Sequence, residues 1–131
     1  MSEAAHACSM KHLPEYIQGA PALRGKGVDL IACISVNDAF VMDAWGKALG
    51  ASDDIMMLAD GSASFARALG SDMDLSARNV GTRSRRYSAI IDDLTVCCPV
   101  HRLALGRGVC TLGVLAARSC NVVSPVRTSQ P

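Results

Sequence analysis

The stretch Val28–Val36 (VDLIACISV) constrains the fold most, because it is almost continuously apolar and has the length of one strand. Such a run is typical of a strand that is buried on both faces, as in a parallel sheet. A helical pattern precedes it: apolar side chains recur every three or four residues over 9–23, with Cys8 and Ser9 at the opening. The turn Gly25-Lys26-Gly27 separates the two elements.

Further alternation of helix and strand patterns follows. Asn37 and Asp38 predict the N-cap of a second helix, and Gly50 predicts its end. The other expected elements are a helix over 39–49, a strand over 55–59, a short helix over 64–69 and a strand over 83–92. This order predicts an α/β fold with a central sheet flanked by helices.

The last third of the chain has a different character. Residues 97–131 contain no acidic residue, show no clear period and hold four of the six cysteines, at positions 97, 98, 110 and 120. Only 109–117 is compatible with a helix. We therefore expect one partial domain over 1–96 and a poorly ordered tail over 97–131, with no catalytic role for the four tail cysteines.

Composition excludes several classes of function. Thirteen Lys and Arg stand against twelve Asp and Glu, so neither nucleic acid nor an anionic membrane is an expected partner. The longest apolar runs are too short to span a bilayer, and no basic region followed by an apolar run marks a secretory signal. The cysteines lack the paired close spacing of a zinc site. We expect a cytoplasmic protein without a metal.

Five segments together resemble the type II peroxiredoxins, the group that includes mammalian peroxiredoxin 5. They are CSMKHLP at 8–14, KGV to VNDAFV at 26–41, WG at 45–46, LADG at 58–61 and GTRSRRYS at 81–88. They follow one another in order over about ninety residues. The resemblance implies a thioredoxin-like sandwich and a thiol-dependent peroxidase that reduces hydrogen peroxide and alkyl hydroperoxides.

The chemistry of such a site agrees with the residues. A cysteine attacks peroxide as a thiolate, and Cys8 in the first turn of a helix lies beside unpaired N–H groups and the positive end of the helix dipole. By resemblance, Arg86 is the permanent positive charge that stabilises the thiolate and polarises the peroxide. We expect Arg83 and Arg85 to be solvated or salt-bridged.

A second thiol must then resolve the sulfenic acid that forms on Cys8. Cys33, 25 positions further on, stands where the family often has a resolving cysteine, although a small buried residue in a strand is the alternative. Other relatives use glutathione, glutaredoxin or thioredoxin, pair as homodimers and need no bound cofactor. We expect His12 to lie on the helix surface or to cap the helix, with polarisation of the site as the alternative, and Trp45 to fill the core or a dimer contact.

The sequence departs from the family at both ends: residues 97–131 match neither the further strand nor the closing helix of the family, and two departures lie before Cys8. Ala5 stands where the family has a threonine that hydrogen-bonds the thiolate, and the family's strand before the cysteine has no counterpart, so we expect strand 28–36 to lack a neighbour. A second hypothesis is therefore an inactive, truncated remnant that at most binds an intact relative. A third, a disulfide-exchange protein using Cys8 and Cys33, lacks a Cys-x-x-Cys pair.

Overall fold

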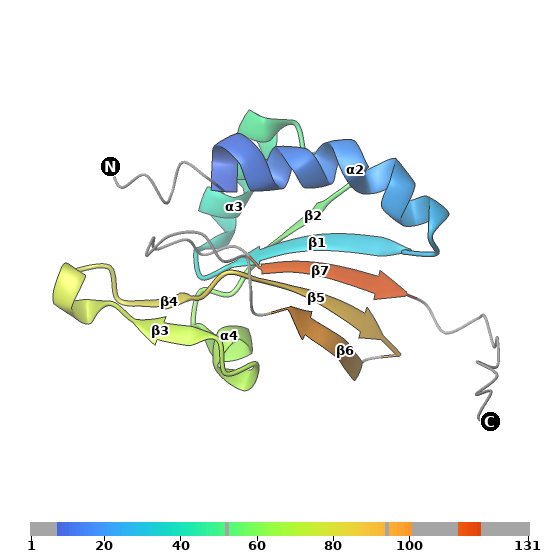
Figure 1. Ribbon diagram of the computed structural model, residues 1–131. Coiled ribbons are helices and arrows are strands. Elements are labelled where there is room, and N and C mark those ends of the chain that lie inside the picture. The colour runs from blue at the N-terminus through green and yellow to red at the C-terminus, as the bar shows by residue number, and fades with distance from the viewer. Residues whose placement is uncertain (1–7, 52, 94, 101–112, 119–131) are drawn as a thin grey trace, which may run out of the picture.

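A computed structural model describes residues 8–51, 53–93, 95–100 and 113–118 of the chain (Figure 1). Helical and extended segments alternate along most of it. In order they are η1 (Cys8–His12), α2 (Leu13–Gly25), β1 (Leu30–Ser35), α3 (Ala39–Leu49), β2 (Met56–Ala59), α4 (Ser64–Ala68), β3 (Asp72–Asp74), η2 (Ser76–Arg78), β4 (Thr82–Ser84), β5 (Tyr87–Asp92), β6 (Thr95–Val100) and β7 (Gly113–Arg118).

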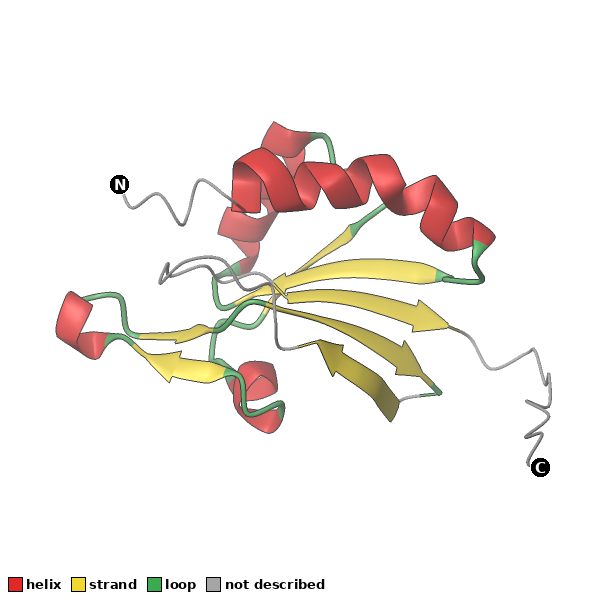
Figure 2. Ribbon diagram, in the orientation of Figure 1, coloured by secondary structure: helices red, strands yellow, loops and turns green. Residues whose placement is uncertain are grey.

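A five-stranded mixed sheet forms the centre of the molecule. Its strand order is β2-β1-β7-β5-β6, and β3 and β4 make a separate two-stranded sheet. β1 runs parallel to β2 and antiparallel to β7, while β7 runs parallel to β5. Figure 2 shows helices on both sides of the sheet. The predicted α/β class with helices flanking a central sheet is confirmed.

The two faces of the sheet bury different side chains. Ile31 and Cys33 of β1 face α2 and α3, in one cluster with Leu13 and Met42. Ala32 and Ile34 face the opposite way and pack with Tyr87, Ala89 and the partly buried Phe65 of α4. This alternation along one strand is what a central strand covered on both faces requires, and it explains the apolar run in the sequence.

Local signals fix several element ends as predicted. The Asp38 carboxylate accepts a hydrogen bond from the Val41 N–H at 2.8 Å and caps α3, which ends at Gly50 in the left-handed conformation (φ 68°). Gly70 likewise adopts a left-handed conformation just after α4 (φ 62°). Apolar periodicity and glycine punctuation therefore identify these elements within a few residues.

The predicted strand over 83–92 is two strands in two different sheets. β4 pairs with β3, whereas β5 pairs with β6 and β7. Between them the backbone N–H of Arg85 donates to the carbonyl of Ser71 at 2.7 Å. The chain thus changes partners at Arg85, which a continuous extended pattern cannot reveal.

Two strands lie in the region where we expected a tail without order. β6 crosses the boundary predicted after residue 96, and 113–118 form β7 although the sequence is compatible with a helix there. β7 gives β1 a second neighbour, so the prediction that strand 28–36 lacks one is wrong. The remainder of the tail, with Cys110 and Cys120, lies outside the described residues.

Candidate active site

Cys8 begins the helical segment that leads into α2. Its first five residues form a π turn, which continues into α2 with Pro14 at the start of the α-helix. Because proline lacks an N–H group, it fits best near a helix start, where intrahelical bonds are not yet required. π turns occur often at functional sites. The structure confirms that Cys8 lies in the first turn of a helix.

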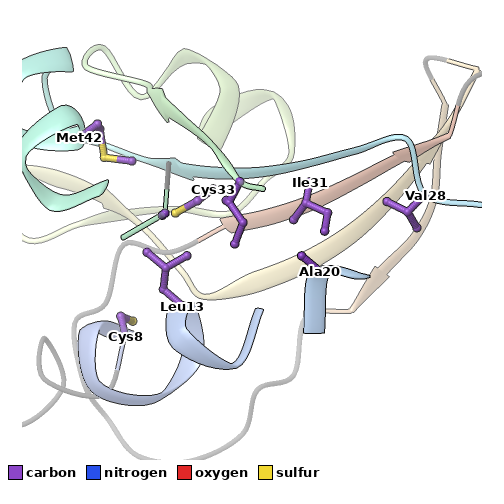
Figure 3. Close-up of a cluster of buried hydrophobic side chains, with 9 residues drawn as sticks. Cys8, Leu13, Ala20, Val28, Ile31, Cys33 and Met42 are labelled. Atoms are coloured by element: carbon purple, nitrogen blue, oxygen red, sulfur yellow. The ribbon is translucent and has the colours of Figure 1, made fainter. Parts of the chain in front are cut away.

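The side chain of Cys8 points into the apolar cluster on the α2 side of the sheet. It is only 2% exposed and belongs to one cluster with Leu13, Cys33 and Met42. In Figure 3 the side chain of Leu13 lies between those of Cys8 and Cys33. The two cysteines therefore share a cluster, with an aliphatic residue between them.

A hydrogen bond holds the Cys8 turn from the side. The indole Nε1–H of Trp45, on α3, donates to the Oγ of Ser9 at 3.0 Å. Trp45 is also partly buried against the same apolar cluster, as a core role predicts. The polar contact with Ser9 is not foreseen in the sequence, because the two residues are 36 positions apart and only the fold brings them together.

Cys8, Cys33 and Cys97 differ in disulfide bonding and in exposure to solvent. Cys8 is disulfide-bonded in this structure, whereas Cys33 and Cys97 are free thiols. Cys33 is fully buried in β1, and this burial raises the pKa of its thiol to about 12. Cys97 is exposed on β6. A buried thiol that stays protonated is a poor nucleophile in the folded chain.

We expect Cys33 to resist alkylation at pH 7–9 while Cys97 reacts, because only Cys97 is exposed and Cys33 stays protonated. Iodoacetamide labelling followed by peptide mass spectrometry would measure both sites at once, and denaturant should make both react.

The pKa of Cys33 is raised on folding, so its contribution to stability is complete below the ordinary value of 9.0 and is lost as pH rises towards 12. Equal labelling of the two native thiols would contradict the burial.

Arg86 lies directly before β5 and is half-buried. Burial lowers the pKa of its guanidinium, but an arginine starting from 12.5 stays charged at neutral pH. The pKa of His12 is lowered as well, first by burial and next by the positive charge of Arg86. The effect of the Arg86 charge on His12 indicates that these two side chains lie near each other, and His12 belongs to the same helical turn as Cys8.

His12 does not act as a helix cap. Its side chain makes no capping hydrogen bond to α2, and its Nδ1 atom is buried with no hydrogen-bond partner within the described part of the chain. With a pKa below 6.5 the imidazole is neutral at pH 7. A neutral, half-buried imidazole next to Arg86 corrects the expected surface or capping role.

The neighbouring arginines differ from each other. The Arg83 Nη1–H donates to the carbonyl of Val36 at 2.6 Å and to the Asn37 Oδ1 at 2.8 Å, and the Asn37 amide donates in turn to the Ser35 Oγ. Arg83 is thus a clamp between β4 and the end of β1, and the expectation that it is solvated or salt-bridged is wrong. Arg85 is exposed.

Tyr87, the first residue of β5, lies buried near an acidic cap. Burial raises the pKa of its phenol, and the charges of Asp60 and Cys33 raise it further. The Asp60 carboxylate accepts hydrogen bonds from the backbone N–H groups of Phe65 and Ala66 at the start of α4. Tyr87 is therefore a neutral core residue beside Arg86, with no nucleophilic role.

The features that suit other classes of site lie elsewhere. A cavity of about 610 Å³ runs along the outer side of β2, and neither Cys8 nor Arg86 lines it. The described residues contain no group of three or more His, Cys, Asp or Glu side chains that could hold a metal ion. Among the helices described, none has the length and apolar character needed to cross a membrane.

Comparison with known proteins decides the family. The Redoxin family model matches residues 5–97. The chain belongs to the Redoxin family, in its type II peroxiredoxin group. It is 53% identical over 88 residues to peroxiredoxin-2E of Arabidopsis thaliana, covering 66% of this chain and 38% of that protein. It is 48% identical over 89 residues to peroxiredoxin-2B of the same plant, covering 68% and 55%.

A solved structure agrees with this assignment. Reduced Prx3 of Vibrio vulnificus in complex with hydrogen peroxide superposes with a TM-score of 0.66 and 55% identity, covering 71% of this peroxiredoxin and 58% of that chain. The predicted thioredoxin-like fold is thereby confirmed. The chain spans between about two fifths and three fifths of the length of these relatives.

Proposed function

We propose that this peroxiredoxin is a thiol-dependent peroxidase in which Cys8 is the nucleophile and Arg86 the electrostatic stabiliser. The observation that carries the proposal is the position of Cys8 in the first turn of a helix. The effect of the Arg86 charge on the pKa of His12, in the same turn, supports the role of Arg86. The likeness to a Prx3 whose structure holds hydrogen peroxide supports the substrate class.

The reaction balances with a peroxide and two thiols. The Cys8 thiolate attacks one peroxide oxygen, an S–O bond forms, the O–O bond breaks, and the electron pair leaves on the second oxygen, which takes up a proton as water or an alcohol. Arg86 faces the negative charge that develops on that oxygen. A second thiol then condenses with the sulfenic acid, forming a disulfide and releasing water.

The burial of Cys8 limits what can reach it. A reduced Cys8 that keeps the 2% exposure of this disulfide-bonded form would admit only a small molecule unless the turn opens, which favours hydrogen peroxide and small alkyl hydroperoxides. Neither Cys8 nor Arg86 lines the cavity beside β2, so we assign it no part in the reaction. The disulfide on Cys8 corresponds to an oxidised, unreactive form that a reductant must open first.

We assign the reductant to an external thiol: glutaredoxin, thioredoxin or glutathione. Cys33 is the alternative resolving residue, and it would require local opening, since Leu13 separates it from Cys8 and its thiol stays protonated. We further propose that the chain forms a homodimer, as its resemblance to the family implies. We also propose a cytoplasmic location.

The test uses the full chain after complete reduction and removal of the reductant. Stopped-flow mixing with hydrogen peroxide should show oxidation of Cys8 at least ~100-fold faster than that of free cysteine, because a site that orients the thiolate and the leaving oxygen provides roughly that factor. Peroxide consumption should then continue when a thiol donor is supplied. Oxidation at the rate of free cysteine would establish the inactive remnant, and Ala5 would be the first position to restore to threonine.

A further inference from the structure

The central strand of the sheet comes from outside the matched region. The family match ends at residue 97, whereas β7 spans Gly113–Arg118. β7 pairs with β1 on one side, from Leu30↔Ala117 to Ile34↔Gly113, and with β5 on the other. In the strand order, β1 and β5 are not neighbours, and among the described strands only β7 is hydrogen-bonded to both. Figure 1 shows β7 between them.

The two strands that β7 joins carry the two halves of the candidate site. β1 packs against the helical segment that begins at Cys8, because Ile31 and Cys33 belong to the same buried cluster as Cys8. β5 begins directly after Arg86. The first residue of β7, Gly113, is in register with Tyr87, so the site-bearing end of β5 is tied to the start of β7.

One β7 side chain also reaches the cluster around Cys8. Ala116 is in register with Ile31 and packs, partly buried, against that cluster. Ala117 is the next residue and points to the opposite face, in register with the partly exposed Leu30. β7 therefore touches the site through its backbone register with β5 and through the methyl group of Ala116.

We propose that the segment Gly113–Arg118 is a positioning element of the active site, which holds the strand that follows Arg86 in register with the strand beneath Cys8. Without β7, no described strand would fix the backbone separation of β1 and β5, and the position of Arg86 would depend on the Arg83 hydrogen bonds and the side-chain packing between β1 and β5. The role of β7 rests on the proposed peroxidase function, but its placement can be tested independently of that function.

The placement is tested by a cross-strand disulfide in the full chain. Val114 is directly opposite Cys33 in the antiparallel register, and two cysteines at such opposed positions lie close enough for a disulfide. Val114→Cys should therefore give, after mild oxidation, a peptide pair in which Cys33 is linked to the introduced thiol, found by mass spectrometry. Leu115→Cys is the matched control, because successive positions of a strand face opposite sides of the sheet, so Cys33 should stay free. Absence of the link in Val114→Cys, or an equal link in both variants, would overturn the placement.

The positioning role is tested by a matched pair of neutral substitutions. Ala116→Leu crowds the cluster of Cys8 and pushes β7 away from it, whereas Ala117→Leu adds the same side chain on the opposite face. We expect Ala116→Leu to slow the oxidation of reduced Cys8 by hydrogen peroxide by about 10- to 100-fold, since a displacement of about 1 Å can have that effect. Ala117→Leu, on the opposite face and outside the Cys8 cluster, should slow the oxidation less than Ala116→Leu does.

The pH profile separates positioning from general destabilisation. If Ala116→Leu moves Arg86 away from Cys8, the pH midpoint for Cys8 oxidation rises towards about 8.5, the ordinary thiol value. Continued protection of Cys33 from alkylation would show that the variant is folded. Equal oxidation rates and equal pH midpoints in Ala116→Leu and Ala117→Leu would overturn the proposal, because β7 would then stabilise the sheet without positioning the site. This conclusion would hold even if the link to Cys33 forms in Val114→Cys. A slow unmodified chain with an intact link would refute only the peroxidase function.

Discussion

Replacing Cys8 by serine should remove peroxide consumption by the reduced chain, leaving at most the background of ordinary thiols. A hydroxyl group is not ionised at neutral pH and makes a far weaker nucleophile than a thiolate, so the S–O bond that begins the reaction cannot form. We expect a loss of at least ~100-fold in the rate of peroxide consumption with a thiol donor.

The matched control for this loss is Cys97→Ser. Cys97 is a free, exposed thiol, so it is the described cysteine most open to unspecific oxidation. Its replacement should leave peroxide consumption within about twofold, which is the range of a surface change away from the site. Cys33→Ser should likewise spare the first oxidation step and slow only a later one, if Cys33 resolves. Loss of activity in Cys97→Ser with retention in Cys8→Ser would reject Cys8 as the nucleophile.

Arg86→Gln should give the second largest effect, a decrease of about 100- to 1,000-fold in the rate of Cys8 oxidation, because removing one oriented donor that faces the developing oxyanion typically has this consequence. Glutamine keeps some hydrogen-bonding capacity and most of the side-chain volume, so the change removes mainly the charge. Arg85→Gln is the control, since Arg85 is adjacent in sequence but exposed, and we expect it to change the rate less than about twofold.

The same variant has a readout that does not depend on turnover. Arg86 lowers the pKa of His12, so its replacement should raise that pKa, while Arg85→Gln should leave it in place. Titration of the imidazole by NMR measures this shift directly. An unchanged His12 pKa in Arg86→Gln would mean that the arginine is remote from the Cys8 turn, and the proposed pairing of the two residues would then fail.

Sequence patterns predict the elements that form from local signals. The apolar run around β1, the Asp38 cap and the left-handed glycines identify β1, α3 and α4 closely, because each depends on a few neighbouring residues. The division of 83–92 into β4 and β5 depends instead on distant partners. One of these is the Ser71 carbonyl that binds the Arg85 N–H.

The family resemblance predicts which residues form the candidate active site, and the contacts in the structure correct the expected roles of some of their neighbours. Cys8 and Arg86 follow from the resemblance, and their pairing stays a prediction that the effect of the Arg86 charge on the pKa of His12 supports. Spacing alone cannot show that Arg83 binds the Val36 carbonyl or that Trp45 binds Ser9, since these pairs are 47 and 36 positions apart. A buried strand position for Cys33 is foreseen, and the structure adds the aliphatic barrier of Leu13.

β7 is the element that sequence reasoning missed most completely. Its composition lacks the charged alternation of an edge strand and the caps of a helix, and 109–117 is equally compatible with a helix. Its extended state is set by the slot between β1 and β5, whose backbone groups it satisfies on both sides. A segment whose conformation is decided by the gap that it fills carries little local signal.

The position of β7 also sets the order in which this chain can be built. β1 emerges from the ribosome early and can pair with β2 soon afterwards, but its second partner is among the last described residues, with Leu30 joined to Ala117. Until then the facing edges of β1 and β5 present unpaired N–H and C=O groups, which can pair with other chains. Contacts so distant in sequence form slowly, because a long loop must close first. The nascent protein therefore passes through a prolonged stage at which the late pairing of β7 competes with aggregation.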